Sequence, residues 1–248
     1  MELPLKSLIT YFYSFLAINS NHKGLRVLGY HSVTNSKSNK DMWSVDRWLF
    51  QDHLTYLQKK KIEVYNIEAL KNKIPDNGIV ITFDDGYKNN LEIAAPILNK
   101  FKMPFSVFVV SDYLNESKTE YLDKASLKEL SDNPLVSIGS HSKTHAKLEE
   151  CSIKQIRSEV RDSKSYLEDV LGKEVSAFSY PHGRFNSLVR DEVMKAGYSL
   201  GFTSHYDLNR PNQDKLILNR NEIWNSDDLN NFKRKIEGHW DWLKYRNL

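Results

Sequence analysis

Short apolar runs alternate with helical patterns along this chain of 248 residues, and that alternation restricts the fold more than any other feature of the sequence. The runs have strand character, and the segments between them carry apolar residues at helical spacing. Strands that alternate with helices form parallel β-α units. About seven such units in a chain of this length suit a barrel better than an open sheet. We therefore predict an α/β barrel, with an open doubly wound sheet as the alternative.

The expected elements follow from these patterns. The predicted strands are residues 25–30, 62–65, 78–83, 105–110, 135–139, 175–180 and 198–203. The predicted helices are residues 48–60, 91–101, 126–131, 153–171 and 187–196. The clearest is 153–171, because Ser152 and Gln155 form a capping box at its start and Gly172 follows its last turn. We expect one domain with a core over about 25–225, on which a helix at 3–18 and a helix at 227–245 pack.

The charge balance and the single cysteine exclude several classes of protein. Lys and Arg total 35 against 32 Asp and Glu, a net charge of +3 without a polybasic block, so we expect no nucleic-acid partner. Cys151 has no second cysteine with which to form a disulfide or a Cys-rich zinc site. No stretch reaches the roughly 18 apolar residues of a membrane-spanning helix.

Residues 3–18 are the nearest approach to such a stretch. Lys6 interrupts them, the start of the chain carries an acid against one base, and no signal-peptide cleavage site follows. We expect an amphipathic helix packed on the domain; the alternative is an interfacial helix that rests on a membrane. We accordingly expect a cytoplasmic protein whose contact with the inner membrane is at most peripheral.

Chemically capable side chains follow the apolar strands at the points where those strands end. They are His31, Asp84, Asp85, His141, His145 and His182. In a parallel barrel the carboxyl ends of all strands lie on one face, and that face carries the active site. Taken singly, each of these residues also fits a turn, the surface or a packed core. Their shared position favours a functional site on that face.

Two histidines four residues apart, together with a carboxylate, indicate a metal site. Imidazole nitrogen and carboxylate oxygen suit zinc and other divalent transition ions. Such a ligand set leaves positions open for water and substrate, and a bound metal lowers the pKa of its water to about 7. The second acid of the Asp84-Asp85 pair is then placed to accept a proton from that water.

Three segments resemble motifs of the polysaccharide deacetylase family, the carbohydrate esterases with a NodB-type homology domain. They are T-F-D-D-G-Y at 82–87, H-S-K-T-H at 141–145 and F-S-Y-P-H-G at 178–183. The similarity runs from about residue 27 to about residue 198. It implies a distorted (β/α)7 barrel that removes N-acetyl or O-acetyl groups from an N-acetylhexosamine-containing glycan, or from a precursor of one, in bacterial surface polysaccharide metabolism.

The resemblance also implies roles for individual residues. Asp85, His141 and His145 would bind the metal, usually Zn²⁺ and otherwise a divalent ion such as Co²⁺ or Ni²⁺. Asp84 would be the general base.

Further residues near the motifs are candidates for contact with the substrate. By the same resemblance, the backbone N–H near His182 would stabilise an oxyanion. Trp43, Tyr87 and Tyr180 lie close to the motifs in the sequence, where aromatic rings either stack on a sugar or pack in the core.

The sequence departs from the commonest family pattern in two places. Ser179 aligns with an arginine that orients the catalytic aspartate, and no Leu-x-His motif follows residue 200. Both departures resemble the branch that includes poly-N-acetylglucosamine deacetylases, which carries an early Tyr-His like Tyr30-His31. We therefore predict His31 as the general acid, with His205 as its competitor, and Arg220 as a stand-in for the missing arginine.

Two other functions remain open on the sequence alone. One is an amide hydrolase on the same barrel that acts on a small non-sugar nitrogen compound. The other is a carbohydrate-binding relative without catalysis. The intact acid pair and histidine pair favour the deacetylase, because a protein without catalysis has no need of a base beside the metal ligands.

Overall fold

Seven parallel strands form the central sheet of the computed structural model, which describes residues 23–36, 41–114 and 119–245. Their order in the sheet is β8-β7-β6-β5-β4-β1-β9. Two short strands, β2 and β3, form a separate parallel pair beside it. The strands are β1 Arg26–Tyr30, β2 Ser32–Thr34, β3 Ser44–Asp46, β4 Ile79–Phe83, β5 Phe105–Val109, β6 Val136–Ser140, β7 Ala177–Ser179, β8 Leu200–Phe202 and β9 Asn221–Glu222.

Residues 215–223 close the sheet into a ring. At one end of this segment, the Leu218 N–H donates to the Gly201 carbonyl on β8 at 2.7 Å. At the other end, the Ile223 N–H donates to the Gly29 carbonyl on β1 at 2.8 Å. The segment therefore joins β8 to β1. The predicted seven-stranded α/β barrel is confirmed, and the open doubly wound sheet is wrong.

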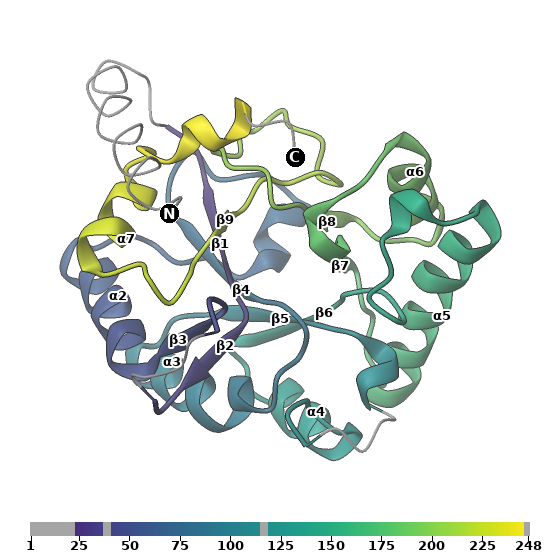
Figure 1. Ribbon diagram of the computed structural model, residues 1–248, viewed down its shortest axis with the longest axis horizontal. Helices are drawn as coiled ribbons and strands as arrows, with labels where there is room; N and C mark the ends of the chain where they lie inside the picture. The colour runs from purple at the N-terminus through teal and green to yellow at the C-terminus, as the bar shows by residue number, and fades with distance from the viewer. Residues whose placement is uncertain (1–22, 37–40, 115–118, 246–248) are drawn as a thin grey trace.

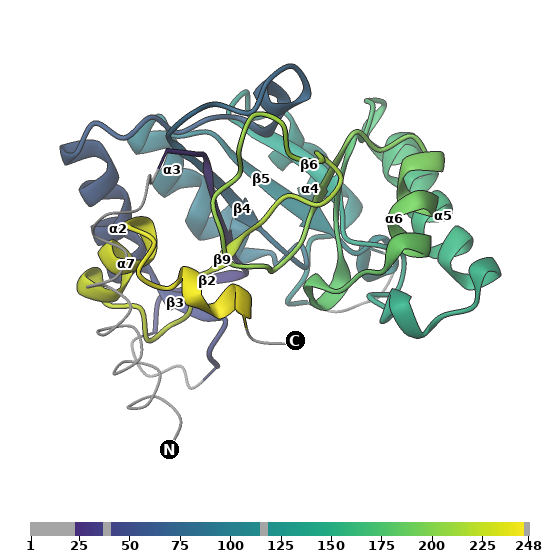
Figure 2. The ribbon, with the colours of Figure 1, turned by 90° about the horizontal axis from the view of Figure 1, so that it is seen from above.

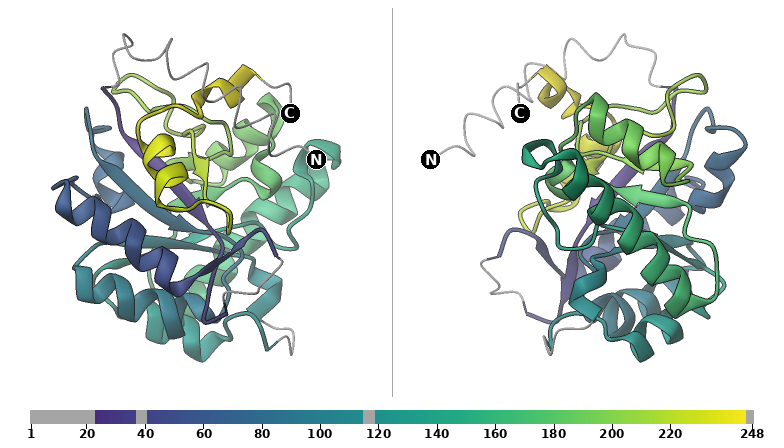
Figure 3. Two further views of the ribbon diagram at one scale, coloured as in Figure 1. Left: turned by 60° about the vertical axis from the view of Figure 1, so that its left-hand side comes forward. Right: turned by 90° about the vertical axis from the view of Figure 1, so that its right-hand side faces the viewer.

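The helices lie outside the ring of strands (Figure 1). Seen from above and from the sides, α2 and α7 cover one flank and α5 and α6 cover the opposite one (Figures 2 and 3). The capping box predicted at the start of α5 is present, and Gly172 ends that helix in a left-handed conformation. The helices are α2 Arg47–Lys59, α3 Ala95–Phe101, α4 Lys124–Ser131, α5 Ile153–Leu171, α6 Ser187–Lys195 and α7 Leu229–Ile236. Shorter helical turns are η1 Ile67–Lys71, η2 Asn90–Ala94, η3 Ser111–Leu114, η4 Leu148–Glu150, η5 Pro181–Gly183 and η6 Asp241–Tyr245.

Side chains alternate between two apolar cores along each strand, as the period of a strand requires. On β4, Ile79 and Ile81 belong to the core between sheet and helices, whereas Val80 belongs to a second core inside the barrel. Thr82 and then Asp84 continue the inward-facing row of Val80. The interior of the barrel is therefore apolar along the middle of the strands and polar at their carboxyl ends.

Several predicted elements differ in the structure. The strand predicted at 62–65 is a single bridge between Val64 and Ile79. The helix predicted at 91–101 begins as one turn of π-helix, η2, before α3. The helix predicted at 227–245 is broken into α7 and η6, because Gly238 adopts a left-handed conformation (φ 82°) that ends the first helix.

The predicted helix at 3–18 lies outside the described residues. None of the helices within the described ranges is both long and apolar enough to cross a membrane.

Candidate active site

A cavity of about 780 Å³ opens at the carboxyl ends of the strands. Sequence positions from 31 to 222 meet there, as the position of chemically capable residues at strand ends predicts. The lining residues are His31, Trp43, Asp84, Asp85, His141, His145, Lys147, Glu149, His182, Gly183, Arg184, Phe185, Ser204, His205 and Glu222.

Asp85, His141 and His145 converge at one point of this cavity. The Asp85 Oδ1 atom lies 3.6 Å from Nε2 of each histidine. One ligand atom from each residue can be chosen so that all three lie within 4.8 Å of one another. Asp85 and His145 both have left-handed backbones, with φ of 70° and 64°. These sharp turns direct side chains from two different loops toward the same point.

The His141 ring is held in one orientation. Its Nδ1 lies 2.8 Å from the carbonyl oxygen of Ser179 on β7. Because a carbonyl oxygen only accepts, Nδ1 must carry the proton, and the neutral ring then presents the lone pair of Nε2 toward Asp85. Such a contact fixes both the tautomer and the direction of a metal-binding histidine.

The loop from 141 to 145 is fixed by a carboxylate of helix α5. Glu159 accepts hydrogen bonds from the N–H groups of Lys143 and Thr144 and from the Thr144 hydroxyl, at 2.6–3.0 Å. The Ser142 hydroxyl accepts from the His145 N–H at 3.0 Å. Burial is the main cause that lowers the pKa of His145 to about 3. His145 is therefore neutral and available as a ligand around neutral pH.

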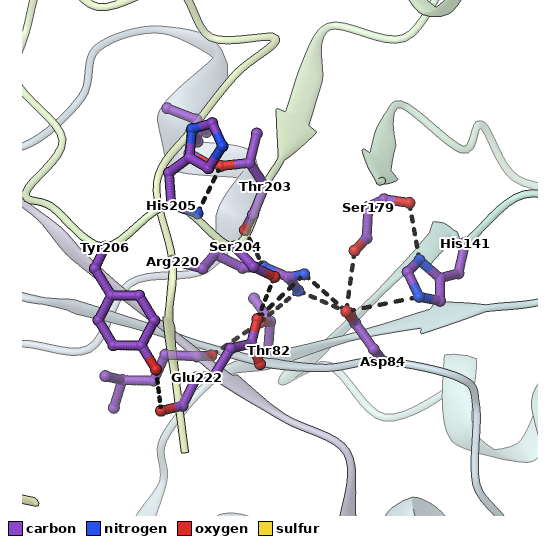
Figure 4. A network of polar contacts seen from close by, with 12 residues as sticks. Thr82, Asp84, His141, Ser179, Thr203, Ser204, His205, Tyr206, Arg220 and Glu222 are labelled. Atoms are coloured by element: carbon purple, nitrogen blue, oxygen red, sulfur yellow. Dashed lines mark hydrogen bonds and ion pairs between the residues drawn. The ribbon is translucent and has the colours of Figure 1, made fainter. Parts of the chain in front are cut away.

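Asp84 is buried beside this cluster, between a guanidinium and a hydroxyl (Figure 4). Arg220 donates to both of its oxygens, at 2.8 Å and 2.7 Å, and the Ser179 hydroxyl donates at 3.1 Å. The His141 Nε2 atom lies 3.7 Å from Asp84 Oδ2. Burial raises the pKa of Asp84, but the Arg220 guanidinium outweighs burial through its charge and its hydrogen bonds and holds the pKa well below its ordinary value. Asp84 is ionised at neutral pH.

Arg220 thus contacts the aspartate that a family arginine would orient. It reaches Asp84 from the segment that closes the barrel, and its Nε donates to the Thr203 carbonyl at 2.7 Å. Ser179, which aligns with the family arginine, contacts the same carboxylate with its hydroxyl. Asp84 is therefore contacted by two side chains, those of Arg220 and Ser179, where the family pattern has one arginine.

Both candidates for the general acid line the cavity. His31 follows β1, and its ring packs against Trp43 with ring centroids 4.4 Å apart. His205 lies near Phe185, and although the residue as a whole is exposed, partial burial of its ring lowers its pKa.

His182 lies at the mouth of the cavity. Its ring centroid is 4.5 Å from that of His145, in an edge-on arrangement. Its backbone is left-handed, with φ of 58°, inside the turn η5. The oxyanion contact predicted for the backbone here stays a prediction.

Two aromatic residues predicted to contact substrate do not line the cavity. Tyr180 is fully buried, and its hydroxyl donates to the Leu216 carbonyl at 2.8 Å. It faces the outer core because it alternates with the inward-facing Ser179. Tyr87 stacks on Tyr121, with ring centroids 4.9 Å apart. Trp43, by contrast, lines the cavity.

One buried acid of the cavity was missed by the sequence analysis. Glu222 lies on β9, two residues after Arg220, and its side chain is 7% exposed. A strand of two residues gives no recognisable apolar alternation. The spacing of two between Arg220 and Glu222 was the available signal, since it places both side chains on one face of an extended segment.

Comparison with known proteins identifies the family of this chain. The family model of polysaccharide deacetylase matches residues 71–201, just over half of the chain. A poly-β-1,6-N-acetyl-D-glucosamine N-deacetylase of Staphylococcus aureus (strain MSSA476) is 28% identical over 219 residues, which cover 83% of this chain and 72% of that protein. The deacetylase PplD of Streptococcus pyogenes, solved with acetate, shares the fold with a TM-score of 0.79 at 23% identity, over 87% of this chain and 99% of that one. The polysaccharide deacetylase BC0361 of Bacillus cereus gives 0.76 at 25% identity, over 86% and 69%. The chain belongs to the polysaccharide deacetylase family.

Proposed function

We propose that this protein is a metal-dependent hydrolase that removes N-acetyl groups from an N-acetylhexosamine glycan or glycan precursor. The observation that carries the proposal is the buried, ionised Asp84, fixed by Arg220 at 2.7–2.8 Å and 3.7 Å from a histidine of the Asp85 cluster. Family membership and the named activity of the S. aureus relative support the substrate class.

The donor set of the cluster fits a divalent metal ion. Asp85, His141 and His145 offer one oxygen and two nitrogens, the atoms that Zn²⁺ prefers, and three protein ligands leave room for water and substrate. The proton on His141 Nδ1 leaves Nε2 free to coordinate. Zn²⁺ is therefore the ion that we propose. A divalent ion held there would acidify a water and polarise the acetyl carbonyl.

Asp84 is the proposed general base. Its carboxylate cannot turn away, because Arg220 occupies both oxygens and Ser179 donates to one of them. It is thus preorganised to accept a proton from the water that attacks the acetyl carbon. Its low pKa keeps it ionised and ready at neutral pH.

His31 is the proposed general acid. It extends from the end of β1 into the cavity, and Trp43 restricts its ring. Protonation of the departing nitrogen by His31 converts the amide nitrogen into an amine, so that C–N cleavage releases acetate and a free amino sugar. Comparison of His31→Gln with His205→Gln tests the choice: full activity in the first and loss in the second would overturn it.

The function is tested by acetate release from N-acetylglucosamine oligomers. Wild type and Asp84→Asn are each assayed with added zinc or cobalt and with a chelator. We expect release that needs both Asp84 and the metal. Asp132→Asn is the matched control, because that side chain is 80% exposed and pairs with Lys173 far from the cavity. Acetate release that survives both the chelator and Asp84→Asn would refute the proposal, and so would its absence from metal-loaded wild type.

A further inference from the structure

Glu222 is a buried acid on the floor of the cavity to which the proposed chemistry assigns no role. It faces the barrel interior beside Gly29 of β1, with which it pairs in register. A Cβ atom at Gly29 would lie only 2.8 Å from the Glu222 Oε2 atom. Glycine at position 29 therefore leaves the space that the carboxylate occupies, on the face of β1 that continues to His31.

The backbone of Glu222 is held firmly. Its carbonyl oxygen accepts from the ammonium of the buried Lys235 at 2.6 Å and from the Tyr206 hydroxyl at 3.2 Å. The Ile223 N–H, the next along the chain, bonds to the Gly29 carbonyl at 2.8 Å. The carboxylate is consequently presented from a rigid support, as a recognition group should be.

The carboxylate has unused capacity to accept hydrogen bonds. Its Oε1 atom accepts from the Ser204 hydroxyl at 2.5 Å and lies 3.8 Å from Arg220 Nη2. Its Oε2 atom is buried and accepts from none of the described residues. A buried carboxylate without a full set of donors is costly. A need to neutralise the charge of Arg220 does not explain why the Glu222 carboxylate is buried, because Arg220 already makes two hydrogen bonds with Asp84.

Glu222 lies within reach of a ligand whose reacting group is at Asp84. The Nη2 atom of Arg220 is 2.7 Å from the Asp84 carboxylate and 3.8 Å from that of Glu222, so the two acids are neighbours across one nitrogen (Figure 4). Glu222 lines the cavity, and the terminal torsion of a glutamate is soft, so its carboxylate can turn toward a ligand bound there.

We infer that Glu222 is a specificity-determining residue that accepts a hydrogen bond from a ring hydroxyl of the sugar whose acetamido group is hydrolysed. The inference rests on the proposed function and adds to it. A carboxylate only accepts hydrogen bonds, and a ring hydroxyl beside the acetamido group can donate one. A site built to bind a substrate hydroxyl strongly rejects an analogue that lacks it.

The test combines a change in the protein with a change in the substrate and compares their separate and joint effects. Wild type and Glu222→Gln are assayed for kcat/KM on an N-acetylglucosamine disaccharide and on analogues whose reacting ring lacks one hydroxyl at a time. We expect one analogue to lose about 10- to 100-fold with wild type, as for a hydrogen bond to a charged group. With Glu222→Gln, the same removal should cost less, about 2- to 10-fold, because the neutral amide oxygen of glutamine accepts a weaker hydrogen bond than a carboxylate does.

Controls separate the possible failures. Glu192→Gln removes a buried carboxylate on α6 that pairs with Arg157 and Lys195, outside the cavity, and should leave every ratio unchanged. If Glu222 only supports the fold, Glu222→Gln lowers kcat/KM equally on all substrates while each hydroxyl keeps its wild-type effect, and the inference is refuted alone. If wild type does not act on the parent disaccharide, the proposed function fails and the inference falls with it.

Discussion

Replacement of Arg220 with methionine should destabilise the protein far more than the loss of a surface ion pair. Arg220 and Asp84 have side chains that are 1% and 4% exposed, joined by hydrogen bonds of 2.8 Å and 2.7 Å. Methionine fills much of the same space but leaves the Asp84 charge buried without its cation. Breaking a buried pair in this way costs about 3–5 kcal/mol. We expect the free energy of unfolding to fall by that amount at neutral pH.

The cost should depend on pH in a defined direction. In wild type the pKa of Asp84 is lowered, so the pair stabilises the fold above the unfolded pKa of about 3.9 and that stabilisation is lost only as pH falls through the lowered value. In Arg220→Met, the guanidinium no longer opposes the effect of burial, so the pKa of Asp84 is raised. Protonation of Asp84 in the variant then relieves the buried charge as pH falls. The difference between the two proteins should shrink from about pH 7 to about pH 5.

Urea unfolding of metal-free protein, followed by tryptophan fluorescence, measures this difference. Arg190→Met is the matched control, because Arg190 pairs with Asp214 where the two side chains are 27% and 35% exposed. Loss of such a pair costs about 0–1 kcal/mol. A cost for Arg220→Met no larger than that of Arg190→Met, or one that grows as pH falls, would show that the account of the buried pair is wrong.

Three further predictions concern other parts of the fold. Ser152→Ala removes the capping box of α5 and should lower the free energy of unfolding by about 1 kcal/mol; an unchanged urea midpoint would contradict this. Gly201→Ala places a Cβ 2.2 Å from the Leu216 carbonyl oxygen. It should separate β8 from residues 215–223, which close the barrel, and abolish acetate release; normal activity would argue against tight packing at this junction. His53 has a pKa lowered by burial to about 3, so unfolding takes up a proton at this residue below the unfolded value of about 6.5, and His53 should contribute a loss of stability of about 1.4 kcal/mol for each unit by which pH falls there. His53→Gln should reduce the slope of stability against pH by that amount and leave the contribution of His145, whose pKa is also lowered to about 3. An identical slope in both proteins would refute the assignment.

The sequence predicted the site best where chemistry follows directly from a strand. Asp84, Asp85 and His141 lie where buried strands end, and parallel strands must bring their carboxyl ends together. The β-branched and aromatic content of those strands sufficed to place their ends to within a residue or two. The convergence of the proposed metal ligands could therefore be predicted without knowledge of tertiary contacts.

The same reasoning failed where proximity in sequence was taken for proximity in space. Tyr180 directly follows Ser179, the last residue of β7, yet the two side chains point in opposite directions. Strict attention to the period of two would have excluded Tyr180 from the cavity. Glu222 could not be placed, because β9 is defined by its pairing with β1 rather than by an apolar pattern of its own.

The ring closure at residues 215–223 also sets an order of events during synthesis of the chain. The proposed metal ligands are all present by His145, whereas Arg220, which pairs with the proposed base, is 136 residues beyond Asp84. A growing chain can therefore hold every proposed ligand while Asp84 is still without Arg220. In the proposed mechanism, hydrolysis waits until β9 joins β1, so the order of translation would separate metal capture from catalytic competence.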